Sequence, residues 1–137
     1  MPHRSPLRSD ERGQSVVETA LSLPIMTVML LGSFEGVRIL LAAIALTSGV
    51  LAGAEYGALG PTSATDTTGI ASAVRQETTP VGGSATNPTV TSSTGTDPSG
   101  ETYVSVSATY TWSSLVPYPG LPRSITLRRS AVMLVRH

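Results

Sequence analysis

The sequence predicts an α+β protein in which the distal half of one long N-terminal helix packs on a small antiparallel β-sheet. Residues 16–58 form a nearly continuous apolar run, long enough for a helix that extends beyond a bilayer. Residues 101–113 alternate between apolar and polar side chains, and residues 124–135 largely do so too, which is typical of strands with one buried face. Such a sheet needs a cover for its apolar face, and the end of the helix is the candidate cover.

Composition excludes several classes of function. The 137-residue chain predicts one domain plus an appendage, and its net charge of zero implies no nucleic-acid partner. Cysteine is absent, which removes disulfides, thiol catalysis and cysteine metal sites. His3 and His137 lie at opposite ends of the chain, and no Gly-x-Ser-x-Gly stretch or phosphate loop is present. We therefore expect a protein that is not an enzyme, with no catalytic, metal or cofactor-binding residues and no small-molecule substrate.

Residues 1–13 form a short basic leader, with Arg4, Arg8 and Arg12 ahead of the apolar run. Such a leader has two interpretations: the start of a secretory signal peptide, or a cytoplasmic flank under the positive-inside rule. A signal peptide needs an apolar core of roughly 7–15 residues. Here the apolar run continues well beyond that length, which favours the cytoplasmic flank.

The apolar run supplies a membrane span. A span needs about 20 residues of helix, and residues 21–41 provide them. Glu35 and Arg38 are the charges within it. Their i, i+3 spacing puts them on one helix face, where they can pair, and Arg38 could also reach the interface. We predict a single transmembrane helix over about residues 19–41, with its N-terminus inside. The alternative is a buried or amphipathic helix of a soluble bundle, although no second helix in the sequence is long enough to cover it.

The helix is expected to span residues 14–60 and to end at Gly60-Pro61. Pro24 is expected to kink it or to open one backbone hydrogen bond. Small residues at four-residue spacing let membrane helices approach closely. The candidate helix-packing residues on this pattern are Gly32, Gly36, Gly49, Gly53 and Gly57.

Residues 61–137 are expected to form a small Ser/Thr-rich β domain outside the membrane, with one short helix. That helix is predicted at residues 69–77, after a polar linker, and its candidate caps are Asp66, Thr67 and Thr68. The remaining expected features are a further strand at residues 89–94, a turn at residues 96–100 and a Pro-rich loop at residues 115–123.

Glu18 is a carboxylate at the start of the membrane segment. Burying it unpaired costs about 2.5–3.5 kcal/mol at mid-membrane. One interpretation is that it lies at the headgroup interface or near the helix N-terminus, where the dipole favours negative charge. The other starts from Gly13, five positions earlier. If the chain is cut between Gly13 and Gln14, a new α-amino group stands one helical turn from Glu18, in the same chain or a neighbour. Between chains, that pair would set axial register.

Gly13 followed by four residues, Glu18 and an apolar helix resembles the type IV prepilin cleavage signal in its short-leader Flp/Tad form. Residues 12–24, from Arg-Gly-Gln-Ser to Leu-Pro, resemble the start of TadE-like pseudopilins. The Phe-Glu-Gly-Val-Arg block at residues 34–38 and the Ala-Glu-Tyr-Gly-Ala block at residues 54–58 also resemble elements of that family. The chain departs from the family at Thr19, where an aromatic residue is frequent, and at Glu55, where a basic one is.

The resemblance implies a pilin-like lollipop fold and a minor pilin or pseudopilin of a Flp/Tad pilus system. It implies cleavage by a prepilin peptidase, and partners among pilin subunits, minor pilins and the pilus assembly platform. The implied location is the cytoplasmic (inner) membrane in a single pass, with the C-terminal domain outside, and an extracellular pilus after assembly.

A second class of function remains open. The chain could be an unprocessed single-pass membrane protein whose outer domain binds a partner. That alternative predicts an uncleaved leader and tolerance of Glu18→Ala. A soluble enzyme is a third class, and no feature of the sequence supports it.

Overall fold

The structure is a computed structural model that describes residues 10–78, 87–115 and 122–136. Its elements are α1 (Asp10–Ala58), α2 (Pro61–Thr65), α3 (Thr67–Glu77), β1 (Thr89–Thr96), β2 (Thr102–Ser113) and β3 (Ser124–Leu134). The chain divides into two compact units, residues 1–36 and residues 37–137. We call them unit 1 and unit 2 and describe each by itself.

Unit 1 consists, in its described part, of the first half of α1. The helix begins at Asp10, four residues before the expected start, and continues through Pro24. Its polar side chains bond back to its own backbone. The hydroxyls of Thr19, Ser22, Thr27 and Ser33 each donate to the carbonyl four residues earlier, over 2.7–2.9 Å. These hydroxyl groups are satisfied without a partner outside the helix, as a lipid environment requires.

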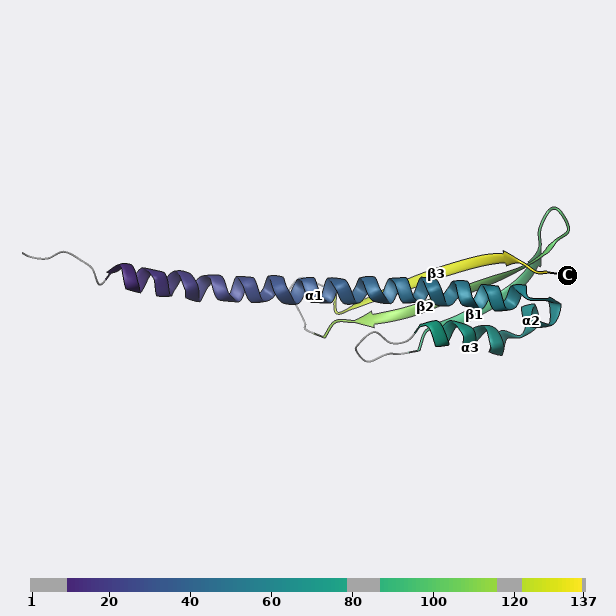
Figure 1. Cartoon of the computed structure of the whole chain (residues 1–137), viewed down its shortest axis with the longest axis horizontal. Helices are drawn as coiled ribbons and strands as arrows, with labels where there is room; N and C mark the ends of the chain where they lie inside the picture. Colours follow the sequence, from purple (N-terminus) through teal and green to yellow (C-terminus); the bar gives the residue numbers. More distant parts are fainter. Residues whose placement is uncertain (1–9, 79–86, 116–121, 137) are drawn as a thin grey trace, which may run out of the picture. The chain divides into compact units, whose positions relative to one another are not determined.

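The sheet lies in unit 2 and has the antiparallel order β1-β2-β3 (Figure 1). Its register pairs Val90 with Ala108 and Val104 with Met133. The alternation along β2 determines its faces as expected: Val104, Val106 and Ala108 are fully buried. Because β2 is the central strand, this buried row forms the middle of the core.

The cover of the sheet comes from two helices. Leu46, Val50 and Ala54 of α1 are buried in the same cluster as Ile70 and Val74 of α3. The end of α1 is also tied to the end of the chain, since the backbone N–H of Arg136 donates to the carbonyl of Ala58 over 2.9 Å. The predicted α+β class, with the distal half of the helix on an antiparallel sheet, is confirmed.

The smaller elements agree with the predictions from the sequence, with one correction. The predicted helix at residues 69–77 is confirmed as α3, and Asp66 caps it by accepting from the backbone N–H of Gly69 over 2.9 Å. The predicted turn is also present. Asp97 Oδ1 accepts from two backbone N–H groups there, and Gly100 takes a positive φ of 86°. The polar linker was wrong in part, because helix α2 starts directly at Pro61, a residue suited to a first helical turn. Most of the predicted loop at residues 115–123 lies outside the described residues.

Candidate membrane and assembly site

The expected cleavage site lies in the first turns of α1. Gly13, Gln14 and Glu18 are all exposed, and a side chain added at Gly13 would meet open space. Gln14 and Glu18 are four positions apart on the helix, so they share one face. The motif is therefore presented on the surface of unit 1, with no cover from the described residues.

The surface around this motif is apolar in every direction. The exposed large side chains of unit 1 are Val16, Val17, Leu21, Leu23, Ile25, Met26, Val28, Met29, Leu30, Leu31 and Phe34. A soluble helix would show such residues along one stripe only. Within the described residues, one helix is long and apolar enough to cross a membrane, and it covers residues 13–58. Its length and composition fit a bilayer span.

Glu35 and Arg38 are both buried, each with 7% of its surface exposed. Their pairing with one another stays a prediction. The structure adds a contact that the sequence did not indicate: the guanidinium carbon of Arg38 lies 5.6 Å from the ring centroid of Trp112. This is cation–π geometry. Trp112 is 4% exposed, so it is a core residue of the sheet.

The five candidate packing glycines lie in two different environments. At Gly32 and Gly36, an added side chain would meet nothing within 4 Å. At Gly49 and Gly53 it would collide with Val74 of α3, and at Gly57 it would press on Val104 of β2. The last three glycines therefore let α1 approach its own domain closely. The first two leave a surface on which another helix could pack.

The outward face of α1 in unit 2 is apolar as well. Exposed residues on it are Val37, Leu40, Leu41, Ile44 and Leu51. They recur at spacings of three, four and seven residues and so form a stripe along the helix. We call this set the outer stripe. It extends past residue 41, the expected end of the membrane span.

A polar cluster joins the end of α1 to α3, and sequence reasoning missed its tyrosine. The hydroxyl of Tyr56 donates to Asp66 Oδ2 over 2.8 Å, while Asp66 Oδ1 caps α3. Hydrogen bonds from the Gly69 N–H and from Tyr56 lower the pKa of Asp66. The bond to Asp66 raises the pKa of Tyr56 above its ordinary value of 10.0. Gly69 fits closely beside both side chains, since a methyl group there would collide with them.

One further residue could have been noticed in the sequence. The row of β3 that faces the helices runs Ile125, Leu127, Arg129, Ala131 and Met133, so a charge interrupts an apolar row. The period-two pattern placed Arg129 among core-facing positions, and that mismatch was the available signal.

In the part of the chain that the structure describes, no group of three or more His, Cys, Asp or Glu residues could hold a metal ion.

An exposed apolar helix in unit 1 and a small helix-covered sheet in unit 2 suggest the class of membrane-anchored proteins. The comparison with protein families narrows this class. The family model described as TadE-like protein matches residues 13–55, fewer than half of the chain's 137 residues. The match confirms the resemblance over that segment, which includes the expected span and four of the five candidate packing glycines, all but Gly57. That family is a pilus-associated structural family, and the similarity to it is limited to this segment of the chain. Searches of curated proteins and of solved structures gave no match.

Proposed function

We propose that this chain is a TadE-like minor pilin or pseudopilin, which a prepilin peptidase cuts and which contributes to assembly of a Flp/Tad adhesive pilus. One observation carries the proposal. The Gly13 to Glu18 motif is exposed at the N-terminal end of an apolar helix, inside the region that matches the family model. A carboxylate in that place is costly in lipid unless it acquires a partner.

Cleavage would supply the partner. Hydrolysis after Gly13 gives Gln14 a free α-amino group, which is positively charged at neutral pH. Glu18 lies one helical turn away on the same face, and on neighbouring helices the two charges can compensate each other. In the uncut chain, Gly13 lies near the start of α1. Glycine is among the weakest helix formers, so this turn can open for the peptidase at low cost.

The proposed location follows from the same helix. The arginine-rich leader would stay in the cytoplasm, residues of about 19–41 would cross the cytoplasmic membrane, and unit 2 would lie outside. Subunits would wait there and enter the pilus when the assembly platform extracts them. Gly32 and Gly36, which are open in the isolated chain, would then contact helices of other pilin and minor pilin subunits.

The test is a pair of glycine substitutions. In cells that contain the peptidase, Gly13→Leu is expected to abolish cleavage, because the side chain obstructs the scissile bond and stiffens the turn. Gly32→Leu, at a site that is equally open, is the matched control and is expected to be cut normally. Electrophoretic mobility and mass spectrometry of the N-terminus report the outcome.

Two results would contradict the proposal. Wild type and Gly13→Leu could migrate alike with an intact N-terminus, or Gly32→Leu could also remain uncut. The first result, together with full tolerance of Glu18→Ala in pilus assembly, would leave the unprocessed membrane-anchored protein as the better account.

A further inference from the structure

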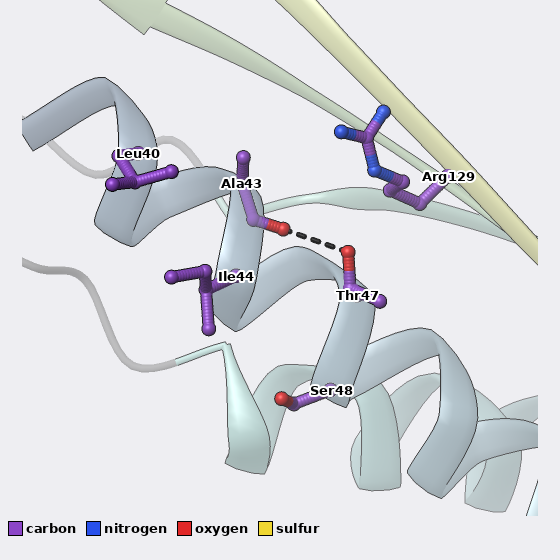
Figure 2. A pocket seen from close by; sticks show the side chains of 6 residues that line it. All are labelled: Leu40, Ala43, Ile44, Thr47, Ser48 and Arg129. Carbon is purple, nitrogen blue, oxygen red and sulfur yellow. Dashed lines mark hydrogen bonds between the residues drawn. The ribbon is translucent and has the colours of Figure 1, made fainter. Parts of the chain in front are cut away.

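A groove of about 280 Å³ lies in unit 2 between α1 and β3 (Figure 2). Its apolar lining residues are Leu40, Ala43 and Ile44, and Leu40 and Ile44 belong to the outer stripe. Its polar lining residues are Thr47, Ser48 and Arg129. Figure 2 shows the guanidinium of Arg129 reaching from the strand toward the helix, on the side of Ala43 and Thr47. The groove thus combines an apolar base with one cationic group.

Arg129 is unusual for its position in the sheet. It is paired with Ala108, which is fully buried, so it belongs to the face of β3 that is turned toward the helices. Arg128 is paired with Thr109 and belongs to the opposite face. Arg129 Nη1 donates to the backbone carbonyl of Arg128 over 3.0 Å. That bond uses one of the five N–H donors of the guanidinium, and other donors remain for a ligand.

The groove starts where the expected span ends. Leu40 and Leu41 are the last residues of that span, and the lining residues on α1 run from Leu40 to Ser48. Eight residues of helix rise by about 12 Å. The headgroup region of one leaflet is about 5–8 Å deep, because a bilayer measures about 40–45 Å in all and its hydrocarbon core about 30 Å. The groove is therefore long enough to span that region.

Charge in unit 2 is separated along its length. Arg123 lies at the end marked by the Arg38–Trp112 contact, because residues 113 and 124 are paired there. Arg128 and Arg129 follow on the same strand. Asp97 and Glu101 lie at the opposite end, near Ala58, where the chain terminus carries Arg136. The end that begins at the expected membrane surface is therefore basic, which favours anionic headgroups.

We propose that this groove binds an anionic phospholipid of the outer leaflet, with an acyl chain on Leu40 and Ile44 and the phosphate on Arg129. The inference rests on the membrane anchoring proposed above. A lipid satisfies both properties of the groove, since its chain covers exposed apolar surface and its phosphate accepts bonds from the guanidinium. A bound lipid would hold unit 2 at the bilayer until assembly withdraws the subunit.

The test uses the full chain in nanodiscs of phosphatidylcholine with a minority of phosphatidylglycerol. After mild detergent extraction, native mass spectrometry gives the ratio of the two lipids that remain bound. Wild type is expected to retain phosphatidylglycerol in preference. Arg129→Gln is expected to lower that preference about fivefold, the effect of one arginine near an anionic surface. Arg128→Gln removes the same charge one residue away, on the other face of the strand, and is expected to leave the preference for phosphatidylglycerol almost unchanged.

A second pair of variants tests the groove without changing charge. Ile44→Trp fills it and is expected to reduce lipid retention. Leu51→Trp, on the outer stripe but outside the groove, is the control. Equal effects of Arg128→Gln and Arg129→Gln would overturn the proposal in favour of diffuse attraction. It would also be overturned by absence of any preference in wild type, or by a second copy of the chain in the groove in place of lipid. Failure of the wild type to insert into the nanodisc would instead overturn the anchoring.

Discussion

The two halves of α1 have similar apolar composition and different surroundings. In unit 1, apolar residues are exposed on every side of the helix, and Gly32 and Gly36 face open space. In unit 2, one face of the same helix is buried against α3 and β2, and Val74 occupies the space beside Gly49 and Gly53. The glycine spacing therefore predicts where another element can approach the helix closely. Which element does so is known only from the packing in the structure.

The largest expected difference between the two halves comes from removing a leucine side chain. Leu46 is fully buried in the core of unit 2, whereas Leu30 is 70% exposed in unit 1. Leu46→Ala is expected to lower the free energy of unfolding of unit 2 by about 2–5 kcal/mol, through lost burial and the cavity left behind. Leu30→Ala is expected to change it by less than about 0.5 kcal/mol.

Chemical unfolding in micelles measures both, followed by the fluorescence of Trp112, the chain's single tryptophan. Because Trp112 is buried in unit 2, its signal reports that unit. Equal losses for the two variants would show that unit 1 contributes to the packing of unit 2, and the contrast between the halves would be wrong.

The next contrast is between two glycine-to-alanine substitutions that are expected to change stability in opposite directions. Gly53→Ala introduces a methyl group against Val74 and near the carbonyl of Ile70, so α3 must move. Overpacking of this kind costs about 1–3 kcal/mol. Gly32→Ala meets open space and gains helix propensity, which favours alanine by up to about 1 kcal/mol. Thermal unfolding should therefore shift down for Gly53→Ala, and helix content in micelles should be kept or raised for Gly32→Ala. A stable Gly53→Ala protein would contradict the close packing.

Much of the fold could be predicted from periodicity, because burial on one face leaves a pattern in the sequence. The alternation along residues 101–113 predicts one buried face, and Val104, Val106 and Ala108 on that face are buried. Periodicity does not name the partner that covers a face, so it could not tell that Gly53 serves α3 and not another subunit. Helix α2 was missed because five residues are too short to show a period.

The candidate site divides along similar lines. The family resemblance, confirmed over residues 13–55, rests on local motifs that are legible in sequence. The contact of Arg38 with Trp112 and the bond of Tyr56 to Asp66 join residues distant in sequence. Such contacts depend on strand register and helix docking, which short-range patterns leave undetermined. Arg129 was visible as a charge in an apolar row, but its role required the groove.

The smallest expected effect is a pH dependence that belongs to unit 2 alone. The pKa of Asp66 is lowered in the folded state by its bonds to Gly69 and Tyr56. Its contribution is therefore full above the unfolded pKa of 3.8 and is lost as pH falls through the folded value. The pKa of Tyr56 is raised, so its contribution is full below pH 10.0 and is lost as pH rises through the folded value.

Unfolding followed by Trp112 should consequently lose stability at both ends of the pH range. Asp66→Asn is expected to flatten the acid side, because the ionisable group is gone. Tyr56→Phe is expected to remove the alkaline loss and to reduce the acid one, since Gly69 still donates to Asp66. An unchanged acid slope in Asp66→Asn would mean that other carboxyl groups set the acid stability of unit 2, and that the Tyr56–Asp66 cluster orients α3 without stabilising it.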